Sequence, residues 1–178
     1  LCGPDGRYGR HLEDILDIVG LKPGLEVASS MSVMVLEKGS FFFCDPYVNL
    51  NPTTCQLAEM AIMAAEQVRK FGIVPRLALL SHSNFGTYQD ESALKMRQVL
   101  DKIKNVAPEL EVEGEMHADA ALSSMIRLKT FPNSILKGQA NLLIMPNLDT
   151  ANIAFNMVKI LADGQPIGPI LLGPKKPI

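Results

Sequence analysis

A loop with neutral hydrogen-bonding groups follows an apolar run that is typical of a buried strand. Ser81, Ser83 and Asn84 carry hydroxyl and amide groups. Gly86 has no side chain, so a ligand can approach the backbone closely there. Hydroxyl and backbone N–H dipoles bind phosphate or carboxylate groups, whereas a plain turn with local hydrogen bonds is the alternative. His82 is a candidate base, although packing or solvation is the commoner role of a loop histidine.

Two later loops carry further candidate ligand groups. Asn147 and Asn152 lie at the start of a predicted helix, where their amides suit a phosphate or amide group of a ligand. Asp149 or Thr150 is expected to cap that helix. Lys175 adds a positive charge in the last loop of the sequence. We predict that these three side chains (Asn147, Asn152 and Lys175) bind a phosphate-bearing ligand together with the Ser81, Ser83, Asn84 and Gly86 loop.

A second pattern has the residue types of a metal site. Glu113, Glu115 and His117 alternate along a predicted strand, and Asp119 follows two residues later. A strand that ends in solvent, with Asp119 as a helix N-cap, explains the same pattern. We therefore predict no metal site. Cys55 lies in the first turn of a predicted helix, where thiol pKa values can fall, but no neighbour in the sequence activates it.

Composition excludes several classes of protein. The 178 residues include 17 basic and 19 acidic side chains, and 47% of them are hydrophobic. Such a chain is globular, and it lacks the basic excess that nucleic-acid binding requires. No apolar stretch is long enough to span a membrane. Three cysteines without metal-site spacing indicate free thiols in a reducing cytoplasm.

Helices and strands are expected to alternate through most of the chain. Apolar runs without alternation, at 77–80 and 142–145, are typical of strands covered on both faces. This order predicts a three-layer α/β/α fold with a mainly parallel sheet. The expected helices are 53–71, 92–106, 119–129 and one ending near 163; the expected strands are 76–80, 110–115, 140–145 and 167–172.

A hairpin is expected before this alternating part, from 31–36 and 41–44 around a short turn with a glycine. A helix with Leu12, Leu16 and Val19 precedes it. We predict that residues 1–50 form part of a first lobe with this hairpin and that residues 51–178 form the α/β lobe. We also expect the chain to be a piece of a longer protein.

Ten stretches make the sequence resemble the phosphate acetyl/butyryl transferase family. They follow one another in order over nearly the whole chain. Within the family, GEMHAD at 114–119 and Val48-Asn49 are most similar to the phosphotransacetylase-like C-terminal domain of bacterial fusion malic enzymes. The stretches are KPG at 22–24, DPYVN at 45–49, PTTCQLAEMA at 52–61, FGIVPR at 71–76, LLSHSNFG at 79–86, EGEMHADAAL at 113–122, GQAN at 138–141, PNLD at 146–149, ANIA at 151–154 and GPILLGPKKP at 168–177.

The resemblance implies a two-lobed architecture similar to isocitrate and isopropylmalate dehydrogenases, and a homo-oligomer that is at least a dimer. Transferases of the family move an acetyl group between coenzyme A and phosphate. In the malic enzymes a separate part oxidises malate to pyruvate and CO2 with NAD(P) and a divalent metal. The transferase-like part of those enzymes resembles a regulatory module that senses acetyl-CoA.

Two departures from the family pattern argue against acetyl transfer. The family's Ser-Arg pair and following Asp have no counterpart within the 178 residues. An ungapped count from Lys22 places Glu13 where the transferases carry an arginine, and a carboxylate repels phosphate. Arg7 or Arg10 takes that place if the alignment shifts.

Three functions follow as expectations. The first is a non-catalytic, acetyl-CoA-sensing and oligomerising domain of a cytoplasmic NAD(P)-dependent malic enzyme. In this reading the chain itself carries no cofactor, and its ligands are acetyl-CoA, coenzyme A or acetyl phosphate. The alternatives are a piece of a catalytic phosphate acetyltransferase and a purely structural dimerisation domain. No nucleic acid or membrane partner is expected.

Overall fold

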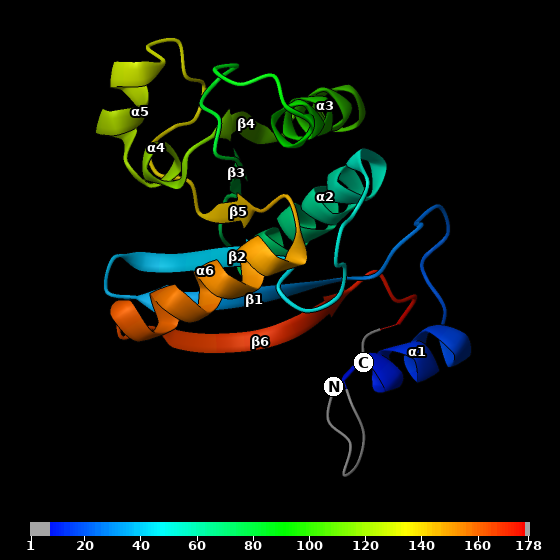
Figure 1. The fold of residues 1–178 in the computed structure, drawn as a ribbon. Coiled ribbons are helices and arrows are strands. Elements are labelled where there is room, and N and C mark those ends of the chain that lie inside the picture. Colours follow the sequence, from blue (N-terminus) through cyan, green and yellow to red (C-terminus); the bar gives the residue numbers. More distant parts are fainter. Residues whose placement is uncertain (1–7, 177–178) are drawn as a thin grey trace.

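The computed structural model describes residues 8–176 and shows alternating helices and strands around one sheet (Figure 1). Helix α1 and the hairpin strands come first, and the helix–strand alternation begins at α2, as the sequence predicts. The elements are α1 Tyr8–Ile18, β1 Ser29–Leu36, β2 Gly39–Cys44, α2 Thr54–Lys70, β3 Arg76–Leu80, α3 Glu91–Val106, β4 Glu111–Met116, α4 Ala118–Leu122, α5 Ser124–Thr130, β5 Leu142–Ile144, α6 Leu148–Leu161 and β6 Gln165–Leu172.

The described strands form a single six-stranded sheet in the order β4-β3-β5-β2-β1-β6. Strands β4, β3, β5 and β2 are parallel neighbours. Strand β1 is antiparallel to both β2 and β6, so β6 runs in the same direction as the other four. The prediction of a mainly parallel sheet is thus confirmed, with β1 as the reversed strand.

The hairpin strands belong to the same sheet as the later strands, and the division into residues 1–50 and 51–178 stays a prediction. Strand β2 pairs with β5, and Phe42 lies opposite Leu142. Strand β1 pairs with β6 on its other side. The hairpin therefore lies inside the sheet that the later strands build, because the apolar residues Phe41, Phe42 and Phe43 need cover on both faces.

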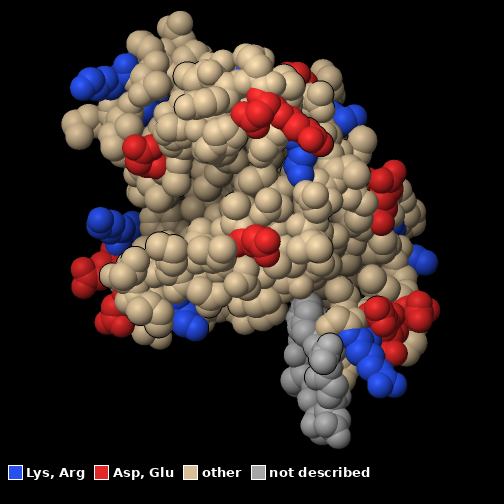
Figure 2. Space-filling model, in the orientation of Figure 1, with Lys and Arg blue, Asp and Glu red and all other residues tan. Residues whose placement is uncertain are grey.

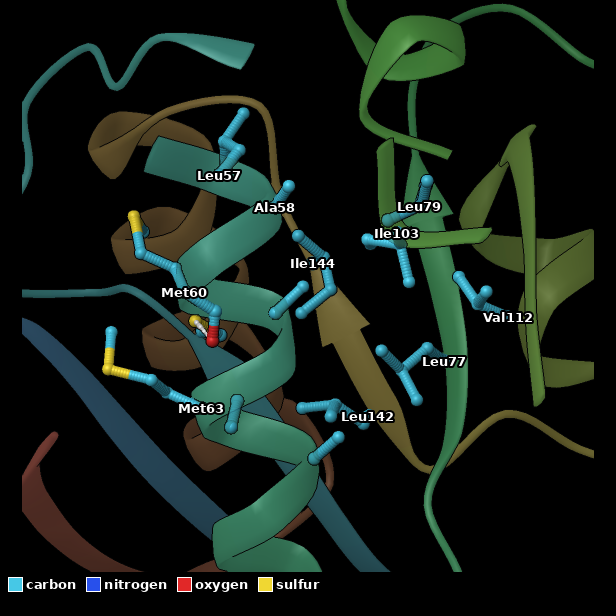
Figure 3. Packing of buried hydrophobic residues seen from close by; sticks show 14 of the residues in the cluster. Leu57, Ala58, Met60, Met63, Leu77, Leu79, Ile103, Val112, Leu142 and Ile144 are labelled. Carbon is cyan, nitrogen blue, oxygen red and sulfur yellow. Dashed lines mark hydrogen bonds between the residues drawn. The ribbon is translucent and has the colours of Figure 1, made fainter. Parts of the chain in front are cut away.

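Helices cover both faces of the sheet. On one face, α2 and α3 pack on the strands around Leu57, Leu77 and Ile144, as Figure 3 shows. On the other face, α4 and α6 cover a second cluster that includes Phe43 and Phe155. The expected three-layer α/β/α arrangement is therefore observed.

Capping explains where α2 begins. Thr53 accepts from the backbone N–H of Gln56, and the Gln56 side chain accepts from the backbone N–H of Thr53. This is the capping box that the sequence predicts. Helix α3 begins one residue earlier than expected because Asp90 caps it.

The single helix expected over 119–129 is two helices, which corrects that prediction. Helix α4 ends at Leu122, and the Ser123 side chain caps α5 by accepting from the backbone N–H of Ile126. His117 is the N-cap residue of α4, so the expected capping by Asp119 is also wrong. Among the described helices, none is long and apolar enough to cross a membrane.

Candidate functional site

The loop after β3 surrounds a buried carboxylate from β4. Glu115 is 1% exposed, and its Oε1 accepts from the Ser83 hydroxyl at 2.6 Å and from the Gly86 backbone N–H at 2.9 Å. The Arg97 guanidinium of α3 lies 3.6 Å from the same oxygen. The carboxyl ends of β3 and β4 lie side by side in the sheet, so the two loops meet there.

The other predicted residues of this loop also have partners within the chain. The Ser81 hydroxyl accepts from the Ser83 backbone N–H at 3.1 Å. The Asn84 side-chain oxygen accepts from the His117 backbone N–H at 2.7 Å. Ser83 is fully buried, and its hydroxyl also accepts from the backbone N–H of Tyr88.

The structure thus brings the predicted loop residues together, but two of their donors already bind an internal anion. The Ser83 hydroxyl and the Gly86 N–H both donate to Glu115. Sequence reasoning assigned Glu115 to a possible metal pattern and missed this role. Glu115 reaches the loop because its strand, β4, pairs with β3. The sequence alone does not show that these two strands are neighbours. Ligand binding by the loop stays a prediction.

His82 contacts a carboxylate at the start of α3. Its Nε2 lies 2.9 Å from Asp90 Oδ2, and its ring centroid lies 5.1 Å from that of Tyr88. The His117 Nε2 donates to the His82 carbonyl at 2.7 Å. The N–H of Ala93 donates to Asp90 and lowers its pKa, and the hydrogen bond to His82 lowers that pKa further. This pairing orients His82 on the surface of the loop.

We expect the pKa of Asp90 to lie below its ordinary value of 3.8 and to rise when His82 is replaced by glutamine, because the replacement removes the imidazolium charge. A depressed folded-state pKa stabilises the fold above the unfolded pKa, and this stabilisation is lost as the pH falls through the folded value. Carboxyl NMR titration from about pH 2 to about pH 6 measures the shift. His117→Gln is the control and should leave the pKa of Asp90 in place. An Asp90 pKa at or above the ordinary value in the unaltered protein would contradict this account.

Asn147 and Asn152 lie near the start of α6, and both amides are engaged there. Asn147 is the N-cap, and its side-chain oxygen accepts from the Thr150 backbone N–H at 3.0 Å. This corrects the expectation that Asp149 or Thr150 caps the helix. Asn152 donates to the Pro46 carbonyl at 3.1 Å and thereby ties α6 to the segment after β2.

Lys175 lies apart from the serine loop, in the segment that follows β6. Its backbone N–H donates to the Gly20 carbonyl at 3.0 Å, and its side chain is exposed. Lys175 lines a groove beside α2 together with Lys22, Lys70 and Lys176. The sequence offered no signal for this convergence, since the four lysines are spread over more than 150 positions.

The acidic residues of the pattern from 113 to 119 lie on β4 and α4 and have separate partners. Glu113 lies beside Arg127 and accepts from the Ile135 backbone N–H at 2.9 Å. Asp119 accepts from the backbone N–H of Ala120. Within residues 8–176, no group of three or more His, Cys, Asp or Glu side chains is placed to hold a metal ion.

Two other residues singled out in the sequence are exposed. Glu13 lies on the surface of α1, one turn after Arg10. Arg7, the other arginine considered for this position, lies outside the described residues. Cys55 is a free, exposed thiol in the first turn of α2.

The comparisons establish the family. The family model described as phosphate acetyl/butaryl transferase matches residues 1–178, so the chain belongs to this family. An NAD-dependent malic enzyme of Rhizobium meliloti is 48% identical over 177 residues, which are 99% of this chain and 23% of that protein. A phosphate acetyltransferase of Clostridium acetobutylicum is 36% identical over 170 residues, which are 92% of this chain and 51% of that protein.

A solved structure confirms the fold. A phosphotransacetylase from Streptococcus pyogenes superposes with a TM-score of 0.94 at 32% identity, covering 98% of this chain and 54% of that one. The chain thus spans about a quarter of the malic enzymes that it matches, and between 23% and 51% of the phosphate acetyltransferases.

Proposed function

We propose that the chain is the phosphotransacetylase-like regulatory and oligomerising domain of a cytoplasmic NAD(P)-dependent malic enzyme, which converts malate to pyruvate and CO2. The observation that carries the proposal is that the chain has a higher sequence identity to a malic enzyme than to a phosphate acetyltransferase. The malic enzyme of Rhizobium meliloti shares 48% of residues with the chain, against 36% for the phosphate acetyltransferase. In this proposal a separate part of the protein binds NAD(P) and a divalent metal, and the whole has the two-lobed, isocitrate dehydrogenase-like architecture.

We propose acetyl-CoA or coenzyme A as the ligand of this domain, without acetyl transfer. The family match supports the ligand class. Two features speak against catalysis. An ungapped count places the Glu13 carboxylate where the transferases carry an arginine, with Arg7 or Arg10 in that place if the alignment shifts. The donors of Ser83 and Gly86 already hold Glu115. The Glu115 carboxylate occupies these donors and pairs with Arg97, so a phosphate ion would have to displace it from them.

A catalytic phosphate acetyltransferase is the second candidate. The relatives of that name and the superposition on the Streptococcus pyogenes phosphotransacetylase favour it. A structural dimerisation domain with no ligand is the third.

Binding and turnover measured together separate the three functions. We expect calorimetry to show saturable binding of acetyl-CoA. We expect an assay of acetyl transfer from acetyl phosphate to coenzyme A to show no activity above a heat-denatured control. Measured transfer would favour the acetyltransferase. Absence of both binding and transfer would leave the structural role.

An exposed apolar stripe on α6 supports self-association. Ile153, Met157 and Ile160 are 57%, 54% and 74% exposed and follow one another at helical spacing, and Leu161 adds to them at 79%. Figure 2 looks onto this helix, and most of the surface in view carries no charged residue. We propose that a second copy of the chain covers the stripe, because contiguous exposed apolar side chains commonly mark an interface.

Ile160→Glu is expected to raise the dissociation constant of the oligomer about thirtyfold, since burying a charge without a partner costs roughly 2 kcal/mol or more. Val74→Glu is the matched control because Val74 is similarly exposed, at 67%, and lies in the loop before β3. Sedimentation velocity over a concentration series measures both variants. Equal association of Ile160→Glu and the unaltered protein would place the interface elsewhere.

A further inference from the structure

A cavity lies between the segment that leads into α2 and the first two turns of α3. Its volume is about 550 Å³. Residues 51–54 line one side, and Glu91, Leu94, Lys95 and Gln98 line the other at helical spacing, so these four share one face of α3. Small-molecule sites typically have volumes of about 300 to 1,000 Å³, so a small ligand has room beside the Lys95 side chain.

The Lys95 amine is held at the wall of this cavity by a neutral partner. The side chain is half-buried, and its Nζ donates to Asn51 Oδ1 at 3.4 Å. Within residues 8–176, no carboxylate lies within ion-pair distance of this nitrogen. The amine has therefore lost part of its hydration without gaining a close opposite charge, which favours its uncharged form.

The charges around the cavity set how readily this amine loses its proton. Burial lowers the pKa of Lys95 below its ordinary value of 10.5, and the Glu91 carboxylate one turn earlier on α3 acts in the opposite direction. Among the described residues, these two are the charged ones that line the cavity. A lower pKa leaves a larger share of the amine uncharged near neutral pH, and the uncharged amine is the form that attacks a carbonyl carbon.

Gln98 offers a donor for an acyl oxygen on the same face of α3. Its side-chain oxygen accepts from the Thr54 hydroxyl at 3.3 Å, which orients the amide. Within the part of the chain that the structure describes, its NH2 group donates to no other residue. An NH2 group three residues from Lys95 can donate to the carbonyl oxygen of a bound acyl group, where negative charge develops as the amine attacks. Leu94 adds an apolar contact for a short acyl chain.

We propose that Lys95 is a modification site, at which the amine accepts a small acyl group such as acetyl from an acyl phosphate or an acyl thioester in this cavity. The uncharged Nζ attacks the carbonyl carbon, so a C–N bond forms and the bond from that carbon to the phosphate oxygen or the sulfur breaks. The leaving group keeps the bonding electron pair, and the nitrogen loses one proton to the solvent. The product is an uncharged amide. The inference goes beyond the proposed function and does not depend on it, because it concerns a covalent change on α3.

The test incubates the full-length protein with acetyl phosphate and, separately, with acetyl-CoA, and follows acetylation of each lysine by peptide mass spectrometry. At about pH 8 we expect Lys95 to be acetylated about fivefold faster than Lys104, an exposed lysine on the same helix. The rate at Lys95 should saturate with the concentration of the donor that the cavity binds. Saturation with acetyl phosphate supports an acyl phosphate as the donor, and saturation with acetyl-CoA supports a thioester. Lys95 no faster than Lys104 with both donors would overturn the proposal.

Glu91→Gln separates activation of the amine from simple exposure. The substitution removes the charge that raises the pKa of Lys95, so acetylation of Lys95 should become about twofold faster. Asp101→Asn removes the same charge from an exposed position of α3 outside the cavity, and it should leave the rate at Lys95 unchanged. A Glu91→Gln rate at or below that of the unaltered protein would contradict the proposal, and so would an equal acceleration by Asp101→Asn.

Discussion

Arg127→Met is expected to lower the free energy of unfolding by about 3 to 5 kcal/mol. Arg127 is fully buried, and its guanidinium donates to the carbonyls of Ala120, Leu136 and Gly138. It also donates to the Ser134 hydroxyl at 2.8 Å. Methionine has nearly the same length but no donor, so these carbonyls lose the guanidinium hydrogen bonds and the buried Glu113 carboxylate loses its cationic partner.

Urea denaturation monitored by circular dichroism measures this loss, with Lys129→Met as the matched control. Lys129 lies on the same helix, α5, is exposed, and loses the same charge. We expect the control to change the free energy of unfolding by less than about 0.5 kcal/mol. An Arg127→Met variant as stable as the control would show that the guanidinium does not hold α4, α5 and the following segment together.

Asp45→Asn is expected to destabilise the fold by about 2 to 3 kcal/mol. Asp45 is 3% exposed, and its two oxygens accept from four backbone N–H groups, those of Ser30, Tyr47, Val48 and Asn49. They also accept from the side chains of Ser30 and Asn49. Asparagine replaces one acceptor oxygen by an NH2 group, so donors then face donors in a buried site.

The control for Asp45→Asn is Asp101→Asn, an exposed change on α3. Thermal and urea unfolding of both variants give the difference. Equal stability would mean that backbone hydrogen bonds at the end of β2 do not depend on the carboxylate.

Local sequence signals predict individual elements of this fold well. The apolar run ending at Leu80 predicts β3 with its observed bounds, and the capping pair Thr53 and Gln56 predicts the start of α2. Both signals act within a few residues, so no knowledge of the tertiary structure is needed.

Features that depend on distant partners were not predictable from one sequence. The hairpin lies within the sheet because β2 pairs with β5 about 100 residues later. The helix expected over 119–129 divides at Ser123, where α5 places Arg127 beneath the carbonyls of the following segment. An exposed lysine or a buried arginine looks the same in a helical pattern, because periodicity carries no information on what covers a face.

The candidate site also combines features that local sequence predicts with features that depend on distant partners. Ser81, Ser83, Asn84 and Gly86 do meet at the carboxyl end of a strand, as the α/β pattern predicts. Their internal partner, Glu115, comes from β4, and the strand pairing that brings it there is non-local. The groove around Lys175 joins residues from three separate segments, so only the structure brings them together.

The most direct test of the proposed function is malate-dependent reduction of NAD and NADP by the full-length protein, measured with and without acetyl-CoA. We predict that the protein oxidises malate with one of these cofactors in the presence of a divalent metal. We also predict that acetyl-CoA changes the rate saturably. No malate oxidation, or a rate that stays constant at every acetyl-CoA concentration, would contradict the proposal.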